Sequence, residues 1–178
     1  MKALKQSLAT IAMLLALAGL GPVSALAGQD NSRLNETIRK QLVTLPYYNV
    51  FDNLAFRVDG DTVTLYGQVT RPSTKKDAER RVARIEGIDR VVNNIEVLPV
   101  STFDDGLRRR VYNQVFRTSS LYRYAMGANP SMHIIVRNGH VTLEGVVSNQ
   151  MDSQLAYMAA NQVPGVFSVT NNLRVERR

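Results

Sequence analysis

Two histidines are the residues of this 178-residue chain that first suggest chemistry. His133 and His140 stand on either side of a predicted tight turn, which would bring their imidazoles near each other. Two imidazoles make a weak metal site here, because the chain has no cysteine and only Glu144 and Asp152 stand near them in sequence. His133 is therefore expected to be an ordinary surface or edge-strand residue, and no metal or other cofactor is predicted.

Patterns typical of catalysis are missing from the sequence. It contains no paired carboxylates for acid-base work, no nucleophile placed with a base, and no glycine-rich phosphate loop. The amide pairs Asn93-Asn94 and Asn171-Asn172 could bind a ligand, but capping or strand-end hydrogen bonding is the expected role. We predict that the protein is not an enzyme.

Arginines in the second half of the chain suggest binding instead. The formal net charge is +7, and no Asp or Glu occurs from Gly106 to Leu143. A basic surface attracts anions, and tyrosine suits a lipid headgroup region because one end of its ring is polar. The predicted contact residues are Arg109, Arg110, Arg117, Tyr122, Arg123 and Tyr124. The alternative is a solvated helix face, with the tyrosines covering the end of the core.

The N-terminus predicts export. A basic start that includes Lys2 precedes the apolar run Leu8–Leu20, and small residues stand at Ala25 and Ala27. This pattern predicts a signal peptide over residues 1–27, cleaved after Ala27, with an uncleaved anchor as the alternative. The mature protein would be periplasmic, without a transmembrane segment, and no lipoprotein, since no cysteine is available. Its anionic partners would be phospholipid or other envelope surfaces rather than nucleic acid.

A repeat organises the rest of the chain. The stretch "VTLYGQV" begins at Val63, and "VTLEGVV" begins 78 positions later at Val141. The same offset relates Gly67 to Gly145 and continues over about 40 residues, which indicates duplication of one folding unit. We therefore expect two domains, at residues 31–99 and 103–177.

Each copy predicts a helix, two strands joined by a tight turn, a second helix and a last strand. The expected elements of the first copy are 34–42, 54–58, 63–69, 73–86 and 91–97. Those of the second copy are 104–117, 132–136, 141–147, 149–163 and 169–175. The resulting α+β fold has two tandem αββαβ units, each a three-stranded mixed sheet with two helices packed on one face. The second copy has gained about five residues after its first helix.

Four glycines are expected to be structural. Gly67 and Gly145 stand inside predicted strands, where a missing side chain lets another backbone approach closely; ligand contact is the alternative. Gly87 and Gly165 are expected to cap the second helices at their C-terminal ends.

The second helix differs between the copies. In the second copy it carries almost no charge, and its apolar arc is wider than one buried face requires. The additional residues are Met151, Leu155, Met158 and Ala159. They are predicted to be covered by the first domain or by a partner; an exposed, poorly charged helix is the alternative.

Both copies resemble the BON domain. The matching residues of the first copy are Val63, Leu65, Gly67, Val69, Gly87, Ile88, Val91, Asn93 and Ile95. Those of the second are Val141, Leu143, Gly145, Val147, Gly165, Val166, Val169, Asn171 and Leu173. Tandem proteins of this build are similar to osmotically inducible periplasmic proteins and to outer-membrane maintenance lipoproteins. The resemblance implies a stress-protective envelope role and reversible association with anionic phospholipid. A protein-interaction or chaperone-like module is the alternative.

Overall fold

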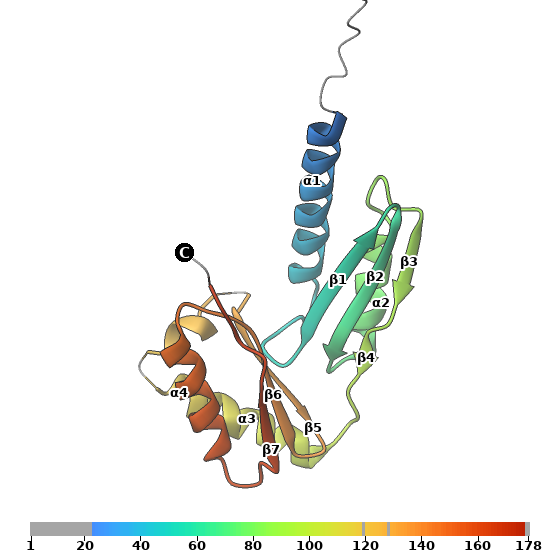
Figure 1. Cartoon of the computed structure of the whole chain (residues 1–178). Coiled ribbons are helices and arrows are strands. Elements are labelled where there is room, and N and C mark those ends of the chain that lie inside the picture. Colours follow the sequence, from blue (N-terminus) through green and yellow to red (C-terminus); the bar gives the residue numbers. More distant parts are fainter. Residues whose placement is uncertain (1–22, 119, 128, 177–178) are drawn as a thin grey trace, which may run out of the picture.

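The computed structural model describes residues 23–118, 120–127 and 129–176, and it consists of two αββαβ units in tandem (Figure 1). The first unit contains α1 (Val23–Val43), β1 (Asn53–Asp59), β2 (Thr62–Val69), α2 (Pro72–Val82), β3 (Arg90–Asn93) and β4 (Glu96–Val97). The second contains α3 (Thr102–Phe116), the 3-10 helix η1 (Tyr122–Ala125), β5 (Met132–Arg137), β6 (His140–Val147), α4 (Gln150–Asn161), β7 (Ser168–Asn171) and β8 (Arg174–Val175). The predicted fold class is confirmed. The predicted signal peptide lies largely outside the described residues.

Each sheet is mixed, with the second strand of the hairpin at its centre. β2 pairs antiparallel with β1 and parallel with β3 and β4, and β6 pairs in the same way with β5, β7 and β8. Leu65 lies opposite Asn93 and Gln68 opposite Glu96, so β3 and β4 keep one register. They are therefore two pieces of the single last strand that the sequence predicts.

An asparagine explains the interruption of that strand. Asn93 donates to the carbonyl of Lys75 at 3.1 Å and accepts from the amide of Ile95 at 3.2 Å. Asn171 makes the equivalent bonds to Ser153 and Leu173 in the second unit. These side chains tie the last strand to the second helix, which is the structural role that the sequence favours for them.

The core of each unit lies between its helices and its sheet. Leu107, Val111 and Val115 of α3 are fully buried, as their helical spacing predicts. Ile38 and Leu42 of α1 are buried in the first unit, and Leu65 and Leu143 of the central strands complete the two cores.

Gly67 and Gly145 lie where the backbone of the neighbouring strand comes very close. Their φ angles are +113° and +116°, a region that favours glycine. A Cβ atom on Gly67 would stand 2.0 Å from the carbonyl oxygen of Asn53, and one on Gly145 would stand 2.1 Å from that of Ser131. The neighbouring strand therefore excludes any side chain at either position.

The second helices end earlier than predicted. α2 ends at Val82 and α4 at Asn161, so Gly87 and Gly165 are not the C-caps of these helices. After α2 the chain continues through i to i+3 bonds such as Ile85 N to Val82 O, and Gly87 then stands in a turn at φ +86°. Such bonds tighten the chain after the last helical turn and move the glycine beyond the helix.

The two units meet through the segment between α1 and β1, residues 44–52 (Figure 1). The carbonyl of Val50 accepts from the amide of Ile134 at 2.8 Å, so this segment covers part of the edge of β5. Val50 and Phe51 join the core of the second unit, where the Phe51 ring lies 6.1 Å from that of Tyr112. An ion pair of 2.8 Å between Glu96 and Arg137 also links the units.

Candidate anionic surface

Buried polar contacts position α3 and leave one of its faces exposed. The hydroxyl of Ser101 accepts from the amide of Asp104 and caps the helix. The Asp104 carboxylate is fully buried and accepts from the amides of Asn138 and Gly139 at 2.8 and 2.9 Å. These bonds join the start of α3 to the β5–β6 turn. The helix face opposite Leu107 therefore points outward.

Three arginines stand on that outward face. Arg109, Arg110 and Arg117 are exposed, and none of them forms an ion pair with any residue that the structure describes. Arg117 is also the C-cap residue of α3, where a cation interacts favourably with the helix dipole. These guanidinium groups are free to meet an external anion.

Two shallow grooves flank Arg117. One, of about 500 Å³, is lined by Tyr112, Asn113, Phe116, Arg117 and Tyr122. The other, of about 240 Å³, is lined by Arg110, Asn113, Gln114, Arg117, Gln162, Val163 and Pro164. Aromatic and cationic groups thus stand side by side. We call Arg109, Arg110, Asn113, Arg117 and Tyr122 the α3 surface.

Two of the six predicted contact residues make contacts within the protein: Tyr124 is buried, whereas Arg123 stays exposed. Tyr124 is only 5% exposed; its hydroxyl donates to Asp152 at 2.5 Å and accepts from the amide of Ser148 at 2.9 Å. Arg123 pairs with Asp152 and donates to the Tyr124 hydroxyl at 2.9 Å. Tyr124 therefore covers the core rather than a ligand, and Arg123 is already paired. Tyr122 is 61% exposed and stays on the surface.

Asp152 holds this internal cluster at the start of α4. Burial raises the pKa of its carboxyl, but hydrogen bonds from Tyr124 and Arg123 outweigh burial, and the net pKa is below the usual range. Asn149 caps the helix by accepting from the Asp152 amide at 2.8 Å. The cluster fixes η1, which carries Tyr122, against α4.

The two histidines lie at opposite ends of the β5–β6 hairpin, contrary to the expected proximity. His133 pairs with Glu144, whereas His140 lies beside the turn and contacts the Ser168 hydroxyl at 2.7 Å. His133 lies on the edge strand β5, one of its two expected places, but it is not a surface residue. It is 8% exposed, and its ring centroid lies 5.6 Å from that of Tyr48. The docked segment of the first unit buries it. Within the described ranges, no three His, Cys, Asp or Glu side chains gather as metal ligands.

The apolar residues of α4 fall into two groups. Ala159 is buried and Leu155 packs against the core of its own unit. Met151 and Met158 are 62% and 48% exposed. The first unit docks on β5, while α4 packs on α3, β6, β7 and β8, so the first unit is not what covers the methionines.

Sequence reasoning missed several residues that shape the surface. Tyr112 and Phe116 build the aromatic groove, and Asp104 anchors the helix that carries the arginines. An aromatic residue four positions after another on a helix is a signal for a shared face, and Tyr112 and Phe116 have that spacing. A buried carboxylate such as Asp104 gives no comparable signal, because its partners come from a distant turn.

Comparison with known proteins identifies the units. The model of the BON domain matches residues 30–99 and 104–177. No curated protein matches the chain. Two solved structures of CdsD, a structural protein of the type III secretion system of Chlamydia trachomatis, are similar at 11% and 10% identity. The first, its C-terminal domain, has a TM-score of 0.35 over 81% of this chain and 98% of that one, and the second 0.33 over 81% and 92%.

BON domains are generally non-catalytic binding domains, and they are associated with the cell envelope or with membrane surfaces. The proteins that contain them are typically periplasmic. In the part of this chain that the structure describes, no helix combines the length and apolar character needed to cross a bilayer. With two matching regions that together span most of its length, the chain belongs to the BON-domain family.

Proposed function

We propose that this protein is an exported, non-enzymatic envelope protein that binds anionic phospholipid surfaces reversibly through the α3 surface. The proposal rests on the row of arginines Arg109, Arg110 and Arg117, which form no ion pair among the described residues and lie beside an aromatic groove that contains the exposed Tyr122. Arginine guanidinium groups match phosphate geometry, and aromatic rings favour the headgroup region.

The expected affinity of the α3 surface for an anionic membrane is modest. Each cation near an anionic leaflet contributes about 1 kcal/mol, so three arginines contribute about 3 kcal/mol. Salt screens this attraction, because the Debye length falls to a few ångströms at about 1 M salt. Such binding suits reversible association without a lipid anchor. The signal peptide predicted over residues 1–27 would direct export, and its cleavage after Ala27 would leave α1 to begin at Gly28. A protective role under osmotic stress is the purpose that the resemblance implies.

Vesicle flotation tests the proposal. The variant Arg109→Gln/Arg110→Gln/Arg117→Gln should bind anionic vesicles about 100-fold more weakly than the parent at about 0.05 M salt. The parent itself should lose binding at about 0.5 M salt and should not bind zwitterionic vesicles.

A matched control removes the same charge elsewhere. Arg57, Arg84 and Arg90 are exposed residues of the first unit and form no ion pair among the described residues. Their triple replacement by glutamine should keep most of the binding. Equal losses in both triple variants would mean that net charge, and not the α3 surface, drives association.

A second candidate function is binding of another envelope protein through α4. The supporting observation is the exposure of Met151 and Met158, since flexible, polarizable methionines are common on adaptable binding surfaces. The variant Met151→Gln/Met158→Gln separates the two candidates, because it changes no charge: it should leave vesicle binding unchanged and reduce capture of an envelope protein partner. Unchanged capture of every partner by this variant would remove the α4 candidate.

A further inference from the structure

A groove of about 820 Å³ lies where the two units meet, away from the α3 surface. One face of α1 contributes Arg39 and its neighbours, and β1 contributes half-buried apolar residues that include Leu54 and Phe56. The second unit contributes residues near His133 and Arg174.

The charged side chains that line the groove are positive. Arg39 and Arg174 line it from different units, and neither forms an ion pair among the described residues. Among the residues that the structure describes, no carboxylate lines it. The nearby acidic groups have other partners: Asp52 accepts from Thr70, and Glu144 accepts from Asn172 at 2.7 Å. The walls therefore offer an anion two arginines that form no ion pair among the described residues, although Asp52 and Glu144, which do not line the groove, keep their negative charge near His133.

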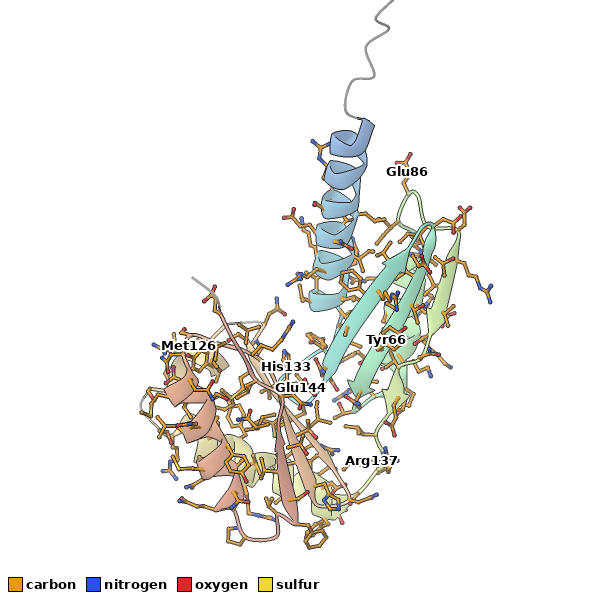
Figure 2. The ribbon with its side chains drawn as sticks, viewed as in Figure 1. Tyr66, Glu86, Met126, His133, Arg137 and Glu144 are labelled. Carbon is orange, nitrogen blue, oxygen red and sulfur yellow. The ribbon has the colours of Figure 1, made fainter. Side chains whose placement is uncertain are left out.

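His133 adds an unpartnered polar group to the lining. Figure 2 shows this residue between the units, and its side chain is more than nine-tenths buried. Its Nδ1 atom forms no hydrogen bond of normal geometry with a described residue, although the backbones of Asn49 and Asp52 lie close enough to act on its pKa. A buried nitrogen without a partner is uncommon in folded proteins and points to a polar group that meets it on binding.

Apolar side chains make up much of the rest of the lining. Leu54, Phe56 and Val58 alternate along β1 and stay half-buried beside α1, because the first unit does not cover them completely. Val146 faces the same groove from the second unit. Ligand sites of about 300–1,000 Å³ with apolar walls and a few placed polar groups are typical for small molecules.

We propose that this groove binds one small amphipathic anion, a molecule with a carboxylate or phosphate head and a single hydrocarbon chain. Arg39 and Arg174 hold the charged head group of the ligand, and the β1 side chains cover its hydrocarbon tail. The ligand would contact both units at once. This site is independent of the α3 surface and of vesicle binding.

Isothermal titration with submicellar probes tests the proposal. Dodecanoate and dodecyl phosphate should both bind the full-length protein. Acetate and inorganic phosphate have no hydrocarbon tail and should not bind. Dodecyl maltoside has the same hydrocarbon tail but no charge, and its affinity should be lower by about tenfold or more. A preference for one of the two charged probes identifies the head group. Equal binding of dodecyl maltoside would overturn the proposal, because the cations would then have no role.

Variants locate the site. Arg39→Gln/Arg174→Gln should weaken binding of the charged probes about tenfold or more, since hydrogen bonds from charged donors are strong. Arg33→Gln/Arg57→Gln is the matched control, because both residues are exposed and neither lines the groove. It should bind like the parent. Equal binding by the Arg39/Arg174 variant, with an unchanged melting curve, would overturn the proposal.

Two further measurements separate this site from the proposed function. Amide chemical shifts of the parent should change on adding dodecanoate at Arg39, Phe56 and His133, and shifts confined to other residues would contradict the groove. The Arg109/Arg110/Arg117 variant should still bind dodecanoate. The Arg39/Arg174 variant should still float with anionic vesicles, so either idea can fail alone.

Discussion

At the scale of single residues, different side chains satisfy equivalent backbone groups in the two units. Asp52 accepts from the amide and hydroxyl of Thr70 at 2.6 and 2.8 Å, just before α2. In the second unit the equivalent amide, that of Ser148, donates to the hydroxyl of Tyr124. The longer loop of the second copy thus replaces a carboxylate with a tyrosine. That replacement explains why Tyr124 is buried.

Removing the Tyr124 hydroxyl should destabilise the protein. Tyr124→Phe leaves the Ser148 amide without its acceptor and Asp152 without one donor, which should cost about 1–3 kcal/mol of unfolding free energy. Urea unfolding measures the loss. Tyr122→Phe is the control, because Tyr122 is exposed, and it should stay within about 0.5 kcal/mol of the parent. A Tyr124→Phe protein as stable as the parent would contradict the assigned bonds.

His133 should make stability depend on pH. Burial lowers the pKa of His133, although the Asn49 backbone, the Asp52 carboxylate and Glu144 raise it. The unfolded chain therefore binds the proton first, and stability should fall as the pH drops below about 6.5 toward the lower folded pKa. Asp52 does not produce this change, because burial raises its pKa from 3.8 and its effect is opposite in sign.

Thermal melts at about pH 7.5 and about pH 5.5 test this dependence. The parent should melt at a lower temperature at the acidic pH. His133→Gln should show a smaller difference, and His140→Gln, at an exposed position, should behave like the parent. The same pH response in His133→Gln and in the parent would remove His133 as the cause.

At the scale of elements, the strand glycines are required by the sheet. Gly67→Ala should cost about 2–4 kcal/mol, because the new methyl group meets the carbonyl oxygen of Asn53 and the φ angle is unfavourable for alanine. Gly60→Ala is the matched control: its φ is also positive, at +61°, but nothing lies within 4 Å of the added carbon. Chemical unfolding should show a clearly smaller loss for Gly60→Ala, and equal losses would contradict the backbone clash.

The sequence predicted most elements because their signals are local and occur twice. Hydrophobic spacing located α1, α3 and the hairpins, and the constant offset of 78 aligned the two units. Helix ends were less predictable, since the turns after Val82 depend on bonds that glycine position alone does not determine. For the proposed site, Arg109, Arg110, Arg117 and Tyr122 were predicted from charge and residue type, and the structure leaves them exposed. Tyr124 could not be placed correctly, because its burial depends on a distant carboxylate, Asp152.

At the scale of the whole molecule, one segment couples the units. Val50 and Phe51 follow α1 in sequence but pack into the core of the second unit. This contact could not be predicted, because the segment lies outside the repeated pattern and its partners are far away in sequence. It also accounts for the burial of His133 and for the groove at the junction.

Loosening this segment should expose the edge of β5. Phe51→Ala removes a half-buried ring that packs against Tyr112, which should cost about 1–3 kcal/mol. Hydrogen exchange of the Ile134 amide should accelerate, because its bond to Val50 would open more often. Phe103→Ala is the control, since Phe103 is partly exposed and packs against Phe167 instead. Unchanged protection of Ile134 in Phe51→Ala would contradict the coupling.

Paramagnetic broadening would show whether the α3 surface meets an anionic membrane. Bicelles that contain anionic phospholipid and a spin-labelled headgroup would be added to the folded protein, and amide signals would be followed residue by residue. We expect the strongest broadening at Arg109, Arg110, Asn113, Arg117 and Tyr122, and we expect it to disappear without anionic lipid or at high salt. Strongest broadening at Met151 and Met158, or on the first unit, would contradict this expectation.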